Sequence, residues 1–261
     1  MYDLPEVREA TDALWRGLAR RLALEGLSGV PEVLVREGPH EAPWSDPALL
    51  FSQSCGYPVT HALADKVRVV ATPRYRAPGC EGSSYRSVIV VGASSQASSL
   101  ADLRGAACVI NEPSSHSGMN ALRALIAPIS GGRPFFASVR RSGAHLASLA
   151  MVGAGEADVA SIDGVTYALA ARARPELVRR TRPIAWSAPA PACPYVTRGD
   201  AGDDLVARIR GALAWTLHDP DLAWARDELL LDGIEILPAE AYDVFLERER
   251  EAARLGYATL L

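Results

Sequence analysis

Short runs of apolar residues alternate along this chain with segments whose apolar residues recur every three or four positions. The first pattern predicts buried strands and the second predicts amphipathic helices. The predicted strands lie at residues 33–35, 49–51, 67–71, 85–91, 106–110, 135–140, 157–162 and 184–186. Strands that alternate with helices are typical of α/β proteins with largely parallel sheets.

The predicted helices follow turn residues that suit helix starts. Asp3 is predicted to cap the first helix, because Pro5 and Glu6 come directly after it. Later helices are predicted after Gly118, from His145 to about residue 153, and at residues 165–174. The tail is mostly helical, with predicted helices over 206–217 and 220–230 and a last one that begins at Pro238.

Two extended segments bracket the middle of the chain, one around Ser87 and one at residues 189–194. Two such segments are expected where the chain passes from a first lobe to a second one and later back to the first. We therefore predict a two-lobed α/β fold with mixed, mostly parallel sheets. Residues 1–86 and 190–261 would form the first lobe, residues 87–189 the second, and the two crossing segments a hinge.

Composition excludes several classes of protein. The chain has 261 residues, of which 49% are hydrophobic, and its formal net charge is −4. It has no basic tract for nucleic acid and no apolar run of membrane-spanning length. The cysteines form no C-x-x-C pair, which disfavours a zinc site or a redox dithiol, and we expect no metal and no cofactor. Disulfides and free thiols both stay open for the four cysteines, which are Cys55, Cys80, Cys108 and Cys193.

The stretch from Asn111 to Asn120 carries the candidate chemistry. It joins a short apolar run to a helical pattern, and its sequence is Asn-Glu-Pro-Ser-Ser-His-Ser-Gly-Met-Asn. A helix start leaves N–H groups without intrahelical partners and carries partial positive charge, so it attracts anions. The hydroxyls of Ser115 and Ser117 would add donors, and Gly118 would let a ligand approach the backbone. The alternative is that Ser115 or Ser117 only caps the helix.

A second polar turn, Ser142-Gly143-Ala144-His145, precedes the next predicted helix. A neutral His145 could donate an N–H to an oxyanion there, whereas a charged imidazole would oppose the helix dipole. The alternative is a buried histidine with a structural role only.

Four motifs in order resemble one known family. Tyr85-Arg86-Ser87, the stretch at 111–118, the turn at 142–145 and the segment at 155–163 resemble the phosphate, phosphite and phosphonate-binding group of type 2 periplasmic substrate-binding proteins. Those proteins serve ABC importers. The resemblance covers residues 51–196 and implies two lobes that close on a ligand held at the serine-rich helix start.

The resemblance also implies roles for individual residues. Ser115, His116 and Ser117 match the hydroxyl-rich triplet, although its middle residue is usually threonine. Tyr85 matches a tyrosine that donates its hydroxyl, and His145 matches the histidine of the second turn. Tyr57 and Asp163 are weaker matches, and each has an alternative. Tyr57 could instead be a turn residue stacked on Pro58, and Asp163 could instead cap the helix at residue 165.

We therefore expect a solute-binding protein that captures a small phosphonate-like or phosphate-like oxyanion for an ABC permease. The alternatives are an enzyme, with Cys55 and either His61 or His145 as nucleophile and base, or a cytoplasmic ligand sensor on the same fold. The sequence has no nucleophile elbow, zinc pattern or P-loop, which disfavours the enzyme. It opens without a signal peptide, so we expect a cytoplasmic product as written, or a periplasmic one if the true start lies upstream.

Overall fold

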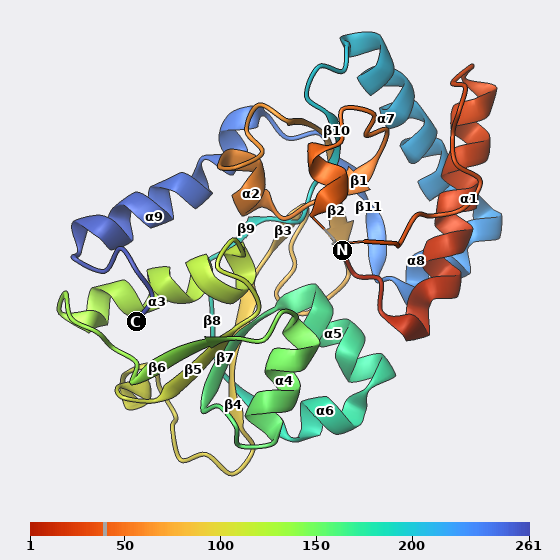
Figure 1. Ribbon diagram of the computed structural model, residues 1–261. Helices are drawn as coiled ribbons and strands as arrows, with labels where there is room; N and C mark the ends of the chain where they lie inside the picture. The colour runs from red at the N-terminus through yellow and green to blue at the C-terminus, as the bar shows by residue number, and fades with distance from the viewer. Residues whose placement is uncertain (39–40) are drawn as a thin grey trace. The chain divides into compact units, whose positions relative to one another are not determined.

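A computed structural model describes residues 1–38 and 41–261 (Figure 1). The chain forms two compact units. Unit 1 comprises Met1–Arg76, Glu81–Ser83 and Pro191–Ala239, and unit 2 comprises Ala77–Cys80, Ser84–Ala190 and Glu240–Leu261.

The last 22 residues therefore group with unit 2, whereas the sequence assigned them to the first lobe. Backbone hydrogen bonds explain the difference. The N–H groups of Phe135 and Phe136 donate to the carbonyl oxygen of Leu261 at 2.6 and 3.1 Å. The Arg123 guanidinium donates to the carbonyl oxygen of Ala258 at 2.7 Å. Such pairings between distant segments leave no local pattern in the sequence.

Unit 1 is an antiparallel sheet with helices packed on it. Its elements are α1 (Arg8–Leu24), β1 (Ser52–Gln53), α2 (Gly56–Thr60), β2 (Val67–Tyr75), β10 (Tyr195–Arg198), α7 (Asp203–His218), α8 (Ala223–Glu228) and β11 (Leu231–Glu235). The strand order is β1-β10-β2-β11, and each of these pairs is antiparallel. Helix α1 packs against α7 and α8. A buried cluster that includes Trp44, Leu63 and Val196 lies at the sheet.

Unit 2 is built on a mixed five-stranded sheet. Its elements are β3 (Ser84–Tyr85), β4 (Ser87–Gly92), β5 (Ala107–Ile110), a π-helix (His116–Asn120), α3 (Ala121–Ser130), β6 (Ser138–Arg141), α4 (His145–Gly153), β7 (Val159–Asp163), α5 (Gly164–Ala173), α6 (Pro175–Arg179), β8 (Thr181–Trp186) and α9 (Val244–Arg254). The strand order is β6-β5-β7-β4-β8. Strand β3 pairs with β9 (Ala190–Pro191).

The parallel strands of unit 2 bring helix starts to one edge of its sheet. Strand β5 is parallel to both β6 and β7, while β4 is antiparallel to β7 and β8. The π-helix follows β5, α4 follows β6, and α5 follows β7. Because carboxyl ends of parallel strands share an edge, the starts of these three helices gather there. Helix α9 lies alongside α3 in the same unit (Figure 1).

The predicted α/β class with mixed sheets is confirmed. Among the strand pairs whose direction is given above, however, only β5–β6 and β5–β7 are parallel. Strand β4 is buried along Val88–Val91, which fits its position inside the sheet. Leu149 and Val152 of α4 pack against this sheet, together with Val90 and Ile162. The apolar runs predicted these strands correctly because they are buried on both faces.

Two predicted strands are wrong. Residues 33–35 form no strand, and Val33 and Val35 are 71% and 70% exposed, so apolar composition alone misled the prediction. Residues 49–51 lie just before β1 rather than in a strand. Leu49 is nevertheless buried, and its carbonyl oxygen accepts from the Arg198 N–H at 3.1 Å.

Two local predictions are also corrected. Asp3 caps no helix, because Leu4 occupies the position before the first turn and the Asp3 carboxylate accepts two hydrogen bonds from Arg36, at 2.7 and 3.0 Å. The strand predicted from Phe135 begins instead at Ser138. All four cysteines are free thiols. Among the described residues, no helix is long and apolar enough to cross a membrane.

Candidate functional site

The hydroxyl-rich turn forms a buried helix start in unit 2. After β5, residues His116–Asn120 form one π-helical turn that continues into α3, and Ser115 occupies the N-cap position. The whole turn from Ser115 to Asn120 is buried. Single π-turns are rare and occur often at functional sites, since they re-aim side chains within a helix.

Ser115 caps this turn and keeps a donor. Its Oγ accepts from the Gly118 N–H at 3.0 Å, and its carbonyl oxygen accepts from the Asn120 N–H at 3.1 Å. The capping alternative is therefore correct for Ser115. A serine hydroxyl has two acceptor sites and one donor, so a hydroxyl that accepts from a backbone N–H can still donate its own hydrogen. Capping and anion binding are thus compatible at this residue.

Ser117 joins the starts of two helices. Its Oγ lies 2.9 Å from Nε2 of His145, the first residue of α4. Its carbonyl oxygen accepts from the Ser161 hydroxyl at 2.5 Å. Ser161 lies in β7 and is fully buried, so the sheet itself fixes the backbone of the turn. Sequence reasoning missed Ser161, which reads as an ordinary strand residue.

Gly118 fits a position that has no room for a side chain. A Cβ atom there would lie 1.8 Å from Oδ1 of Asn111 and 3.3 Å from Cε1 of His145. The space beside Gly118 is therefore taken by the Asn111 side chain, and the close approach of a ligand to this backbone stays a prediction. The Asn111 Oδ1 atom is buried without a hydrogen-bond partner among the described residues.

His145 is a neutral histidine in this environment. Burial lowers its pKa to about 4, although a hydrogen bond with the backbone of Ser161 acts in the opposite direction. An imidazolium at a helix N-terminus would also oppose the dipole. A neutral ring can either accept from the Ser117 hydroxyl or donate to it, so this pair adapts to a ligand without a change of charge.

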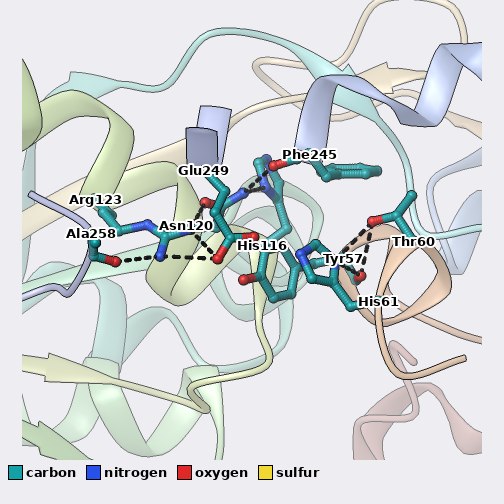
Figure 2. A network of polar contacts seen from close by, with 9 residues as sticks. All are labelled: Tyr57, Thr60, His61, His116, Asn120, Arg123, Phe245, Glu249 and Ala258. Atoms are coloured by element: carbon teal, nitrogen blue, oxygen red, sulfur yellow. Dashed lines mark hydrogen bonds and ion pairs between the residues drawn. The ribbon is translucent and has the colours of Figure 1, made fainter. Parts of the chain in front are cut away.

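His116 is 1% exposed and is held by a second polar network in unit 2. Figure 2 shows Asn120 between Arg123 on one side and His116 and Phe245 on the other. The Arg123 guanidinium donates to Oδ1 of Asn120 at 2.7 Å, which directs Nδ2 of Asn120 toward the Phe245 carbonyl oxygen and toward His116 Nδ1, both at 3.3 Å. Arg248 of α9 lies 3.1 Å from His116 Nε2.

Both ring nitrogens of His116 thus face N–H donors. Burial, and to a smaller extent the charge of Arg248, holds the pKa of His116 well below its usual range. A neutral imidazole has one acceptor nitrogen only. The contacts to Asn120 and Arg248 therefore cannot both be hydrogen bonds in the same tautomer. Asn120 and Arg248 compete for the single acceptor nitrogen of the ring.

The remaining predicted residues divide between the units. Tyr85 is buried in unit 2, where its ring meets His116 edge-on at a centroid distance of 6.2 Å. Asp163 is also buried in unit 2 and caps α5, since its Oδ1 accepts from the Thr166 N–H at 2.9 Å. Tyr57 belongs to unit 1, where its ring stacks on that of His61 at a centroid distance of 3.9 Å (Figure 2).

Unit 2 therefore brings together Ser115, His116, Ser117, Gly118, Tyr85 and His145. Glu112, which precedes them, accepts a hydrogen bond from Arg141 at 2.5 Å. Among the described residues, no group of three His, Cys, Asp or Glu side chains is placed to hold a metal ion.

Sequence reasoning missed the contribution of α9. Arg248 follows Phe245 by one helical turn, in a segment of alternating Glu and Arg that is typical of a solvated helix. No local signal distinguishes Arg248 from its neighbours, because its role depends on the packing of α9 beside α3.

Comparison with known proteins identifies the family of this chain. Residues 49–242 match the family model for the periplasmic phosphonate substrate-binding protein of ABC transporters. None of the curated proteins compared matches the chain.

Solved structures share the fold at low sequence identity. PhnD1 from Prochlorococcus marinus in complex with methylphosphonate has a TM-score of 0.75 at 14% identity, over 96% of this chain and 95% of that one. A binding-protein component of a phosphonate ABC transporter from Pseudomonas aeruginosa has a TM-score of 0.73 at 15% identity, with coverage of 93% and 82%. A Xanthomonas citri protein bound to ATP gives 0.69 at 17% identity, with coverage of 96% and 94%.

The two phosphonate-binding structures, from Prochlorococcus marinus and Pseudomonas aeruginosa, are two-lobed periplasmic binding proteins. The two-lobed fold predicted from the sequence is therefore confirmed. The family match spans well over half of the sequence. The chain belongs to the phosphonate substrate-binding protein family of ABC transporters, whose function is solute binding.

Proposed function

We propose that this protein binds the oxyanion group of a phosphonate-like ligand at the start of the π-helix in unit 2. The observation that carries the proposal is the Ser117 Oγ–His145 Nε2 contact of 2.9 Å at a buried helix start whose N-cap hydroxyl, on Ser115, keeps a hydrogen to donate. Two hydroxyls and the partial positive charge of a helix start form a site for an anion.

The neutral histidine supports a hydrogen-bonding mode. In the bound state His145 Nε2–H would donate to Ser117 Oγ, which frees the Ser117 hydroxyl hydrogen for a phosphonate oxygen. Ser115 would donate its hydroxyl hydrogen to another oxygen. A bound dianion would raise the pKa of His145 from about 4 and so strengthen the contact.

Three further residues complete the proposed ligand set. His116 is the middle residue of the triplet, and its edge-on ring contact with Tyr85, at a centroid distance of 6.2 Å, supports the inclusion of the Tyr85 phenol. Gly118 stays in the ligand set as a prediction from the family resemblance, since the Asn111 side chain lies against it and its N–H donates to Ser115 Oγ. Tyr57 of unit 1 and Asp163 stay predictions that rest on the family resemblance, and Asp163 already uses one carboxylate oxygen to cap α5.

We also propose that the captured ligand is handed to an ABC permease, as expected of the family. Delivery of this kind takes place outside the cytoplasm, so this part of the proposal predicts an exported protein. The methylphosphonate complex of the Prochlorococcus marinus relative supports the ligand class at the level of fold.

Binding can be tested with a panel of methylphosphonate, inorganic phosphate and sulfate. A ligand that binds only the folded state stabilises it by about 2.7 kcal/mol at one hundred times its Kd. That corresponds to a rise in melting temperature of roughly 5 °C for a protein of this size. We expect such a rise with methylphosphonate and a saturable heat in titration calorimetry. No shift and no heat with any phosphonate or phosphate at millimolar concentration would contradict the proposal.

The same samples test the enzyme alternative. Phosphorus NMR of methylphosphonate recovered after prolonged incubation should show the unaltered compound. A new phosphorus signal that depends on the protein would favour catalysis instead.

A further inference from the structure

Two arginines of unit 2 converge on one short segment after β8. Arg86, which follows Tyr85, donates from Nη1 to the carbonyl oxygen of Ser187 at 2.8 Å. Arg248 of α9 donates from Nη2 to the carbonyl oxygen of Pro189 at 2.5 Å. Residues two apart in an extended chain are about 7 Å from each other. The backbone of residues 187–189 thus orients both guanidinium groups.

Neither guanidinium has a carboxylate partner. Among the described residues, no Asp or Glu oxygen lies within 4 Å of Arg86 or Arg248, whereas Arg123 and Arg141 pair with Glu249 and Glu112. Burial lowers the pKa of Arg248, and the charge of Arg86 lowers it further, although Tyr85 and the exposed Glu247 act in the opposite direction. A partly buried pair of like charges is unfavourable unless an anion joins it.

The pair adjoins the hydroxyl-rich turn. Nη1 of Arg248 lies 3.1 Å from Nε2 of His116, the middle residue of the triplet. That contact competes with the one between Asn120 and His116, because the neutral ring has a single acceptor nitrogen. An acceptor that took over the Arg248 N–H would let His116 accept from Asn120 and donate from Nε2. An oxyanion beside Arg248 would therefore end this competition, because it would accept from the guanidinium in place of the ring.

We propose that Arg86 and Arg248 form a second anion subsite beside the hydroxyl-rich turn, and that the ligand carries a second acidic group on its organic part. A carboxylate fits best, because a planar guanidinium donates two parallel hydrogen bonds to it. This inference rests on the proposed function, since it assumes that Ser115 and Ser117 hold the phosphonate end of the same ligand.

Calorimetry with methylphosphonate and phosphonoacetate, which adds one carboxylate, tests the subsite. We expect the native protein to bind phosphonoacetate at least tenfold more tightly than methylphosphonate. Arg248→Gln and Arg86→Gln should each weaken phosphonoacetate binding at least tenfold more than methylphosphonate binding. Arg248→Lys, which keeps the charge and loses the planar fork, should retain part of the preference.

Arg250→Gln is the matched control, because it removes one positive charge from an exposed position of the same helix. Its two affinities should equal those of the native protein. A native protein that binds methylphosphonate as tightly as phosphonoacetate would overturn the subsite but leave the proposed function intact. The subsite would also be overturned if Arg248→Gln and Arg86→Gln, with normal melting temperatures, both still preferred phosphonoacetate to methylphosphonate. Absence of binding by either compound would overturn the proposed function itself.

Discussion

Ser117 Oγ lies 2.9 Å from His145 Nε2, and this contact links the starts of two helices that follow neighbouring parallel strands. Both residues are buried, and the ring is neutral at physiological pH because burial lowers its pKa to about 4. The partial positive charges of two helix starts thus meet at a pair of groups that carry no net charge. Such a place attracts an anion and repels a cation.

The lowered pKa of His145 predicts that the protein loses stability in mild acid. In the unfolded chain the pKa of this histidine is about 6.5. Between that pH and pH 4 the unfolded state therefore binds a proton at His145 that the folded state does not bind. The stabilisation is complete above pH 6.5 and is lost as the pH falls toward 4. The loss should approach about 3 kcal/mol over that range for this group. The free energy of urea unfolding, measured from pH 7 to pH 4.5, checks it.

A His145→Asn variant should show a shallower loss over the same pH range, because it removes the titrating ring. His218 provides the control, since it is exposed near the end of α7. If His145→Asn and native protein lose stability in parallel, the buried ring is not responsible for the acid sensitivity.

A methyl group at Gly118 should disrupt the site. In Gly118→Ala the new Cβ would overlap Oδ1 of Asn111 at 1.8 Å, and the Asn111 side chain would have to move. We expect a loss of roughly 1–3 kcal/mol of stability together with a large loss of methylphosphonate affinity. Gly211→Ala in α7 is the matched control, since nothing lies within 4 Å of its Cβ position and alanine suits a helix interior. Equal stability of the two variants would show that the contact between Asn111 and Gly118 is loose.

Removal of Arg123 should destabilise unit 2. This guanidinium is buried and donates to Asn120 Oδ1 and to the Ala258 carbonyl oxygen, both at 2.7 Å, and it pairs with Glu249 at 3.4 Å. Arg123→Met leaves these acceptors without a donor, which should cost about 3 kcal/mol. The exposed control Arg250→Met should change little. Urea unfolding of both variants distinguishes the outcomes, and a normal midpoint for Arg123→Met would mean that water replaces the lost bonds.

Much of the fold was readable from the sequence because buried strands leave continuous apolar runs. Strands β4, β5 and β7 were predicted on that basis, and the α/β class with mixed sheets is confirmed. The exposed run at residues 33–35 shows the limit of the rule, since valines also occur in loops. The grouping of residues 240–261 with unit 2 depends on contacts such as that between Leu261 and Phe135, which no local pattern encodes.

The family resemblance is confirmed, and it rested on local motifs at strand ends and helix starts. The start at Ser115 and the capping role of Asp163 were both readable, because caps are local features. Ser161 and Arg248 were not, since each reaches the turn from an element distant in sequence. Which residues bind the ligand stays a prediction for all of them.

The most direct test of the central claim is the Kd of methylphosphonate for a Ser115→Ala/Ser117→Ala double variant, measured by titration calorimetry beside native protein. The variant should keep the fold, with a stability loss near 1 kcal/mol from the missing cap. Its affinity should fall by a factor of a hundred or more, because two hydroxyl donors to an anion are removed. An unchanged Kd in a folded double variant would show that the anion binds elsewhere.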